Sequence, residues 1–206
     1  MKGAIFDLDG VIVDTAKYHY LAWKELAQRL GFFFKESDNE RLKGVSRMTS
    51  LEILLEVGGI TATDEEKQIM SKEKNDRYVE MLQSLKKSEL LEGAEDYLKK
   101  LKNDGVLIAL GSASKNAPMI LEKLGITDYF DAIVDGNSVS AAKPDPEVFL
   151  KGAELLGLDP KDCVVFEDSQ AGIEAARNAG CGVIAVDKGG VLCDADKYVK
   201  CLGDLL

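Results

Sequence analysis

Pairs of carboxylates follow two short apolar runs of the sequence. Asp7 and Asp9 stand one residue apart at the end of the first run, and Glu167 and Asp168 end the other. Ionised carboxylates are costly to remove from water unless a cation pairs with them, and several in one small site repel one another. Because all-oxygen ligation suits a hard divalent cation, these side chains predict a Mg²⁺ site with positions open for water or phosphate.

The first acidic pair has two other interpretations. Asp9 alone suits a turn before a glycine. A calcium-binding loop that begins at Asp7 is excluded, because its sixth position would be Ile12 rather than Gly and its twelfth Tyr18 rather than Glu.

A hydroxyl and a lysine occupy equivalent places further along the chain. Ser112 follows the second apolar run in GSASKN, and Lys143 lies in AAKPDP after the third. Each alone suits a solvated loop, and Ser169 suits the N-cap of a helix after Glu167. Their joint appearance at the ends of predicted strands favours one site, in which a carboxylate cluster faces a hydroxyl and a lysine.

The apolar runs alternate with helical patterns. Helical periodicity with a Gly stop covers residues 117–124 and 172–179. Apolar strands that alternate with helices indicate an α/β fold with a Rossmann-like, parallel five-stranded sheet covered on both faces. Ligands bind beyond the carboxyl ends of such strands. The predicted strands are residues 4–6, 106–110, 132–134, 163–166 and 183–186.

The first interval between predicted strands is too long for a single βα connection. It spans roughly ninety residues, nearly all with helical patterns, including residues 50–56, 64–85 and 94–102. We therefore expect an α/β core of residues 1–13 and 83–206, and a helical cap of residues 14–82 that acts as a lid. One apolar stripe of the cap consists of Ala16, Tyr20, Trp23, Ala27 and Leu30.

The composition argues against several classes of protein. The 206 residues have a formal net charge of -10 and a pI near 4.7, which argues against a broad surface for nucleic acid or an anionic membrane. Without a signal-peptide pattern or a long apolar run, we expect a cytoplasmic protein, and a monomer. The cysteines are expected to be reduced thiols rather than disulfide or zinc ligands, because no CxxC pair occurs among Cys163, Cys181, Cys193 and Cys201.

Four motifs resemble those of the haloacid dehalogenase-like hydrolase superfamily over essentially the whole chain. They are FDLDGVIVDT, the strand-end Ser112, Lys143 within AKPDPEVF, and FEDSQAGIEAA. Within the superfamily the sequence is most similar to the β-phosphoglucomutases. This likeness rests on DTAKYHYLAWKELA, LKGVSRMTSLE, KNDRYV and GSASKNAP.

The resemblance implies distinct roles for the first two aspartates. Asp7 would be the nucleophile that forms an aspartyl-phosphate, and Asp9 the general acid and base on the sugar hydroxyl. Two carboxylates held in different protonation states can supply both roles. Mg²⁺ would be held by Asp7, the backbone carbonyl of Asp9, Glu167 and Asp168. The transferring phosphate would be held by Ser112 and Lys143, near Ala113, Ser114, Lys115 and Asn116.

The predicted cap would supply further substrate contacts. Arg47 suits bidentate recognition of the phosphate that is not transferred, although a Lys/Arg pair on a loop is by itself typical of a solvated face. By resemblance, His19 would lie beside Asp9 when the cap closes. From sequence alone, a packing role explains His19 as well as a functional role does, and it explains Trp23 better. The implied cap residues are His19, Trp23, Lys43, Gly44, Val45, Ser46, Arg47, Lys74 and Asn75.

The resemblance implies a Mg²⁺-dependent sugar-phosphate mutase that interconverts β-D-glucose 1-phosphate and D-glucose 6-phosphate through a bisphosphate. The alternative is a phosphatase on the same scaffold that acts on a small phosphorylated metabolite. A binding protein without activity would lack one of Asp7, Asp9, Lys143 or Asp168, and all four are present. The apolar run at residues 32–34 suits cap packing or a partner surface, and the C-terminal tail carries no motif.

Overall fold

Six parallel strands form the sheet of this computed structural model, which describes residues 1–42 and 45–206. The strand order is β3-β2-β1-β4-β5-β6. The strands are β1 (Gly3–Phe6), β2 (Leu107–Gly111), β3 (Ala132–Val134), β4 (Cys163–Glu167), β5 (Gly182–Val186) and β6 (Lys197–Val199). The helices are α1 (Ala16–Arg29), α2 (Glu36–Asn39), α3 (Arg47–Gly58), α4 (Asp64–Leu82), α5 (Ala94–Asn103), α6 (Ala117–Leu124), α7 (Glu147–Leu155) and α8 (Gln170–Ala179).

The sequence prediction of an α/β fold is confirmed, but its count of five strands is wrong by one. The sixth strand, β6, pairs with β5 at the edge of the sheet. Only Val199 of its three residues is buried, while Lys197 and Tyr198 are exposed. An edge strand with one buried side chain has no continuous apolar run, so the pattern used to find the buried strands did not apply to it.

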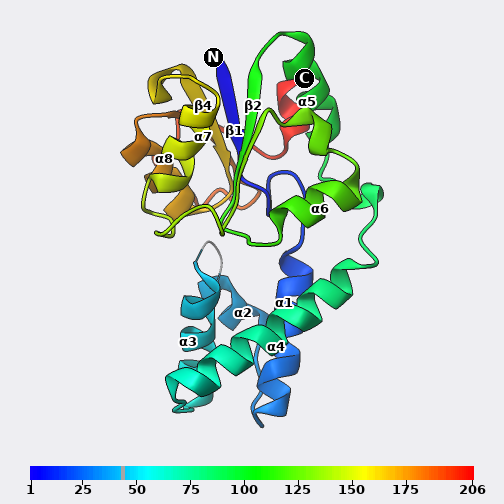
Figure 1. Cartoon of the computed structure of the whole chain (residues 1–206), viewed down its shortest axis with the longest axis vertical. Coiled ribbons are helices and arrows are strands. Elements are labelled where there is room, and N and C mark those ends of the chain that lie inside the picture. The colour runs from blue at the N-terminus through cyan, green and yellow to red at the C-terminus, as the bar shows by residue number, and fades with distance from the viewer. Residues whose placement is uncertain (43–44) are drawn as a thin grey trace. The chain divides into compact units, whose positions relative to one another are not determined.

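Helices cover both faces of the sheet. Figure 1 shows α7 and α8 on one side of the strands and α5 and α6 on the other. On the first side Phe149 of α7 and Ile173 of α8 pack in one cluster with Ile5. On the other side the ring of Phe6 stacks on Phe166, with 4.4 Å between centroids. Burial of both faces explains why the central strands are continuously apolar.

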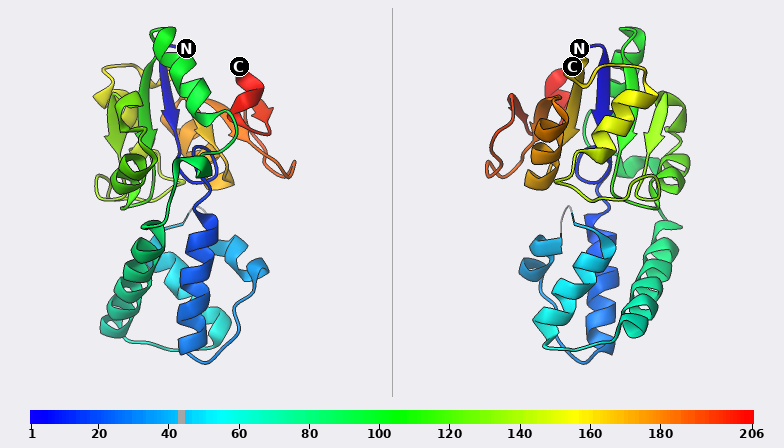
Figure 2. Two further views of the ribbon diagram at one scale, coloured as in Figure 1. Left: turned by 90° about the vertical axis from the view of Figure 1, so that its right-hand side faces the viewer. Right: turned by 60° about the vertical axis from the view of Figure 1, so that its left-hand side comes forward.

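The chain divides into two compact units, residues 1–14 with 85–206, and residues 15–84. Compared with the expected cap of residues 14–82, the second unit begins one residue later and ends two residues later. It consists of α1 to α4, and Figure 2 shows α1 and α4 side by side. Its core includes Trp23 and Phe34, whereas Phe33 is 69% exposed. The run at residues 32–34 is thus partly core of the helical unit and partly surface.

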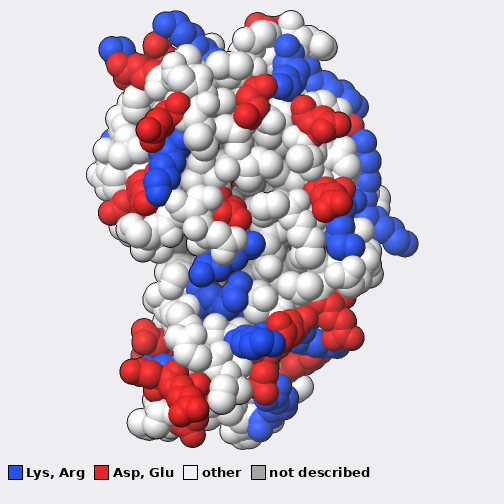
Figure 3. Space-filling view, viewed as in Figure 1, with Lys and Arg blue, Asp and Glu red and all other residues white. Residues whose placement is uncertain are grey.

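Other expectations concern the surface and the thiols. Acidic and basic side chains are interspersed on the face shown in Figure 3. All four cysteines are free thiols. Among the described residues, no helix has both the length and the apolarity needed to cross a bilayer.

The register of the sheet places the strand ends beside one another. Phe6 of β1 pairs with Leu110 of β2 on one side and with Phe166 of β4 on the other. The next residue, Asp7, continues this register, because its N–H donates to the carbonyl of Phe166 at 2.9 Å. Asp7 therefore leaves the sheet between the ends of β2 and β4, at the edge where parallel sheets bind ligands.

Candidate active site

Lys143 forms a buried ion triad with two carboxylates at this edge. Its Nζ lies 2.6 Å from Asp7 Oδ1 and 2.5 Å from Glu167 Oε1. The side chains of Lys143, Asp7 and Glu167 are 3%, 11% and 1% exposed. Although burial opposes its charge, the two carboxylates raise the pKa of Lys143 above its usual value, so the ammonium stays protonated. Three residues predicted from separate strand ends are thus brought together.

Glu167 also anchors the start of α8. Its Oε2 accepts hydrogen bonds from the N–H of Ser169 at 2.8 Å and from the Ser169 hydroxyl at 2.9 Å. Ser169 is the N-cap, and its Oγ accepts from the N–H of Gly172 at 3.1 Å. A Cβ at Gly172 would overlap the Glu167 carboxylate, so glycine is required there. The interpretation of this segment as a helix start is therefore confirmed, and the same glutamate also takes part in the ion triad.

Asp168 comes close to the turn that carries Asp9. Gly10 has φ +82°, and a Cβ on it would overlap the Asp168 carboxylate. The turn is closed by Leu8, whose carbonyl accepts from the N–H groups of Ile12 at 2.9 Å and Val13 at 3.1 Å. A glycine at this position therefore allows the backbone after Asp9 to pass against a second acidic side chain.

The carboxylates at this edge outnumber the one buried cation. Burial, partly opposed by Lys143 and reinforced by Glu167, raises the pKa of Asp7 to about 6. Burial and the charges of Glu167, Asp7 and Asp9 raise the pKa of Asp168 to about 8. An additional cation would relieve this repulsion, and carboxylate oxygens are the ligands that Mg²⁺ prefers. The residues present therefore fit Mg²⁺.

Side chains alone do not complete such a cation site. Among the described residues, no group of three or more His, Cys, Asp or Glu side chains is arranged to hold a metal ion. Both oxygens of Glu167 are already bonded, one to Lys143 and the other to Ser169. Glu167 Oε1 keeps one lone pair beyond its bond to Lys143, so Glu167 stays a predicted ligand together with Asp7, Asp168 and the backbone carbonyl of Asp9.

Residues 112–116, hereafter the Ser112 loop, connect β2 to α6. Ser112 is 1% exposed, and its N–H continues the sheet by donating to the carbonyl of Val134 at 3.0 Å. Its hydroxyl oxygen accepts from the N–H of Ser114 at 3.1 Å, and Ser114 Oγ accepts from the N–H of Asn116 at 3.3 Å. The loop thus winds tightly from the strand into the first turn of α6, where backbone N–H groups favour an anion.

In the second unit, the half-buried His19 pairs with the buried Lys74. Lys74 Nζ lies 2.7 Å from His19 Nδ1, and the His19 ring stacks on Tyr78 with 4.0 Å between centroids. The same ammonium lies over the rings of Trp23 at 4.4 Å and Tyr78 at 4.9 Å. Because an ammonium only donates, Nδ1 accepts and the ring proton is on Nε2. Asn75 follows Lys74 on α4 and is half-buried.

Arg47 begins α3. The preceding residue, Ser46, is the N-cap, and its Oγ accepts from the N–H of Thr49 at 3.2 Å. Burial lowers the pKa of Arg47, with Tyr78 and Asp76 opposing the shift. Val45, Ser46 and Arg47 are half-buried. The predicted residues Lys43 and Gly44 lie outside the described part of the chain.

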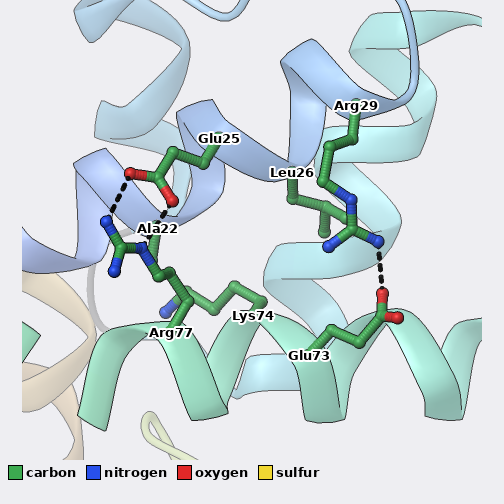
Figure 4. Close-up of a pocket in the computed structure, with 7 residues that line it drawn as sticks. All are labelled: Ala22, Glu25, Leu26, Arg29, Glu73, Lys74 and Arg77. Atoms are coloured by element: carbon green, nitrogen blue, oxygen red, sulfur yellow. Dashed lines mark hydrogen bonds and ion pairs between the residues drawn. The ribbon is translucent and has the colours of Figure 1, made fainter. Parts of the chain in front are cut away.

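Two ion pairs join the helices that carry His19 and Lys74. Figure 4 shows Arg77 of α4 paired with Glu25 of α1, and Arg29 of α1 paired with Glu73 of α4. The shortest N–O distances are 2.7 Å and 2.6 Å. Lys74 lines the small pocket between these pairs. Each pair is largely exposed and therefore contributes little to stability, although both bridge α1 and α4.

Asp135 is a strand-end carboxylate that the sequence interpretation missed. It follows β3 as Asp7 follows β1, and it is 7% exposed. Its hydrogen bonds go to Asn137 and Ser138, and the adjacent Gly136 donates to the carbonyl of Ser114 in the Ser112 loop. The same pattern, an Asp before Gly at the end of an apolar run, was available in the sequence.

Comparison with known proteins places these features in a family. Residues 4–186 match the model of the haloacid dehalogenase-like hydrolases. A β-phosphoglucomutase of Bacillus subtilis (strain 168) is 45% identical over 207 residues, which cover 100% of this chain and 92% of the relative. A phosphorylated carbohydrates phosphatase of Thermotoga maritima is 33% identical over 183 residues, covering 87% of this chain and 82% of the relative.

A solved structure gives the same result. The crystal structure of a β-phosphoglucomutase from Clostridium difficile matches with a TM-score of 0.95 at 41% identity, covering 100% of this chain and 93% of that chain. The resemblance predicted from the sequence motifs is thereby confirmed. With a family model that spans most of its length and relatives that match it from end to end, the chain belongs to the haloacid dehalogenase-like hydrolase family.

Proposed function

We propose that the protein is a sugar-phosphate mutase that interconverts β-D-glucose 1-phosphate and D-glucose 6-phosphate through a bisphosphate intermediate. The observation that carries phosphoryl transfer is the buried contact of 2.6 Å between Lys143 Nζ and Asp7 Oδ1, within a cluster of carboxylates. This contact holds a carboxylate nucleophile next to a cation that can neutralise an incoming phosphoryl group. The likeness to β-phosphoglucomutases extends through the helical unit, which favours a mutase.

The reaction consists of two phosphoryl transfers at Asp7. In one, the free hydroxyl of the glucose monophosphate attacks the phosphorus of the aspartyl-phosphate, Asp9 takes its proton, the bond between phosphorus and Asp7 breaks, and the bisphosphate forms. In the other, an Asp7 oxygen bonds to the phosphorus at the opposite end of the bisphosphate, the bond from phosphorus to the sugar oxygen breaks, and Asp9 gives that oxygen a proton, which releases the second monophosphate and restores the aspartyl-phosphate. Ser112 and Lys143 hold the oxygens of the phosphoryl group, and this positioning supplies much of the rate enhancement.

Mg²⁺ is the proposed cofactor. Asp7, Asp168 and the backbone carbonyl of Asp9 would hold it, and it would neutralise charge on the transferring phosphoryl group. Glu167, predicted as a further ligand, would bind the metal through the lone pair of Oε1 that its bond to Lys143 leaves open.

The helical unit is proposed to bind the rest of the substrate. Arg47, with Val45 and Ser46 before it, would hold the phosphate that is not transferred, because a half-buried guanidinium at a helix start binds phosphate bidentately. Lys43 and Gly44 stay predicted parts of this segment. The sugar would contact His19, Trp23, Lys74 and Asn75.

One assay tests the mutase reaction directly. The purified protein is incubated with Mg²⁺, β-D-glucose 1-phosphate and a trace of the 1,6-bisphosphate, while glucose 6-phosphate and free phosphate are measured together. We expect glucose 6-phosphate to accumulate in large excess over free phosphate. Stoichiometric release of phosphate without glucose 6-phosphate would refute the mutase and leave the phosphatase.

Two variants test the residue roles. Asp7→Asn should abolish turnover, because the amide cannot form the aspartyl-phosphate; normal activity would overturn the nucleophile assignment. Arg47→Ala should reduce mutase flux more than the hydrolysis of p-nitrophenyl phosphate, which has no second phosphate. Equal losses in the two reactions would contradict the role of Arg47.

The phosphatase is the second candidate. The Thermotoga maritima relative is a phosphorylated carbohydrates phosphatase, and it shares 33% identity over most of both chains. Both reactions use the same residues in the α/β unit. They differ in whether water or a sugar hydroxyl accepts the phosphoryl group from Asp7, which the ratio of free phosphate to glucose 6-phosphate measures.

A further inference from the structure

Asp135, the buried acid after β3, has no direct part in the reaction proposed above. Its Oδ1 accepts from the N–H of Asn137 at 3.0 Å and from the Ser138 hydroxyl at 2.8 Å, and its Oδ2 accepts from Asn137 Nδ2 at 2.9 Å. Burial opposes its charge, but hydrogen bonds from Ser138 and Asn137 hold the pKa of Asp135 below its usual value. The ionised carboxylate thus closes a tight turn of residues 135–138, hereafter the β3 turn.

Asn137 links the β3 turn to the Ser112 loop. Its Nδ2 donates to the carbonyl of Lys115 at 3.2 Å as well as to Asp135. Because both neighbours of this amide group are acceptors, only the nitrogen end of the side chain fits there. An aspartate of the same shape at position 137 would place an acceptor, and a charge, against both of them.

Gly136 makes the second link. Its N–H donates to the carbonyl of Ser114 at 3.2 Å. A Cβ at Gly136 would overlap the carbonyl oxygen of Ala113, so the two backbones are in direct contact. In a planar trans peptide the oxygen and the following N–H point in opposite directions. Holding the Ser114 oxygen toward the β3 turn therefore directs the N–H of Lys115 to the opposite side of the Ser112 loop.

The other end of this segment is attached to α7. The N–H of Ser140 donates to Glu147 Oε2 at 2.7 Å, and Lys151 Nζ donates to the carbonyl of Ser138 at 2.6 Å. Lys151 also pairs with Glu147 at 2.6 Å. Lys143, whose ammonium contacts Asp7, stands three residues after Ser140. The β3 turn is therefore the connection between the two parts of the site that would hold the phosphoryl group, the Ser112 loop and Lys143.

We propose that Asp135 and Asn137 are positioning residues for phosphoryl transfer, which set the Ser112 loop against Lys143 without touching the substrate. The inference rests on the proposed function, because it concerns the phosphate-holding groups of that site. Each bond of the β3 turn is local and contributes little buried apolar area. Loss of Asn137 therefore changes where the loop lies more than whether the protein folds.

The test compares Asn137→Ala and Asn137→Asp with the wild type and with a matched control, Asn103→Ala. Asn103 is exposed at the end of α5 and has no part in the site. Hydrolysis of p-nitrophenyl phosphate in Mg²⁺ gives kcat and KM whichever sugar the enzyme uses. Inhibition by orthovanadate, which imitates the phosphoryl group in flight, measures how well the site holds that group. Urea unfolding of each protein reports stability.

For both Asn137 variants we expect kcat to fall by about 10- to 100-fold with KM nearly unchanged, since small displacements of positioned groups have effects of this size. The vanadate inhibition constant should rise in proportion to the loss of kcat/KM, while the urea midpoint stays near that of the wild type. Asp135→Asn should share these effects, because its amide would place a donor against Asn137 Nδ2.

The outcomes separate the two proposals. Wild-type kcat and vanadate inhibition in the Asn137 variants would overturn the positioning role and leave the proposed function intact. A fall in the urea midpoint large enough to account for the lost activity would also overturn it, in favour of a structural role. A wild-type protein that neither binds vanadate nor cleaves any phosphate ester would overturn the proposed function, and the inference with it.

Discussion

The half-buried ring of His19, stacked on Tyr78 and bonded to Lys74, predicts a pH dependence for the stability of the helical unit. It is the only histidine of the chain. Burial, the Lys74 ammonium and the Arg47 guanidinium hold the pKa of His19 well below its usual value. His19 therefore stays neutral in the folded protein over the range in which the histidine of the unfolded chain takes up a proton.

The sign and the size of the effect follow from this difference. The folded state binds fewer protons than the unfolded state below pH about 6.5, so the stabilisation is present above that pH and is lost as the pH falls. Each pH unit below it costs up to about 1.4 kcal/mol of unfolding free energy. Between pH of about 7.5 and 5.5 the wild type should therefore lose roughly 1.4 kcal/mol more than a variant without the ring.

Urea unfolding at the two pH values, for the wild type and His19→Gln, measures this quantity. Carboxylates titrate in both proteins, so their contributions cancel in the difference. NMR titration of the single imidazole gives its pKa directly, and ¹⁵N shifts report whether the ring proton is on Nε2. Lys74→Met should move the pKa part of the way back, because burial remains. An imidazole that titrates near its usual pKa, or equal pH slopes for both proteins, would refute the reasoning.

Three further changes test the packing of the candidate site and of the helical unit. Lys143→Met should destabilise the protein by about 3–5 kcal/mol in urea unfolding, because it leaves two buried carboxylates without their cation. The control Lys161→Met removes an exposed pair with Asp159 and should leave the urea midpoint unchanged. Gly10→Ala should reduce turnover far more than Gly125→Ala. Both glycines have positive φ, but only at Gly10 would the added Cβ overlap a carboxylate, that of Asp168. Equal losses would assign the effect to backbone strain alone. Thr63→Ala removes the capping box of α4 and should lower the free energy of unfolding by about 1 kcal/mol relative to the control Thr61→Ala. Equal stability of the two variants would contradict the role of the capping box.

The sequence predicted the site best where the sheet itself positions the residues. Asp7 and Glu167 follow neighbouring strands in register, so knowing where each strand ends was enough to place them together. Lys143 was found by its loop motif. The pairing of His19 with Lys74 spans 55 positions and involves two helices, so no local pattern joins these residues. Only the resemblance of the surrounding motifs to one family predicted that both residues contact the substrate.

The parts that the sequence did not predict lack the signals on which the prediction relied. The strand β6 buries one residue of three, and the helix α2 has four residues and buries none, so neither has an apolar periodicity. Asp135 had the right pattern, but it follows a strand whose loop was considered only for its lysine. The second role of Glu167, as the partner of Ser169, depends on side-chain geometry that spacing alone does not give.

The two halves of the proposed phosphate-holding site are fixed by different forces. Asp7 extends a central strand whose residue Phe6 is fully buried and stacked on Phe166, so its position is maintained by the apolar core. The Ser112 loop is held at its far side by hydrogen bonds to the β3 turn, which bury little apolar surface. Changes to the core beneath Asp7 should first reduce stability, and changes to the β3 turn should first reduce turnover. In the proposed site, the hold on the phosphoryl group would therefore change through the Ser112 loop while Asp7 stays in place.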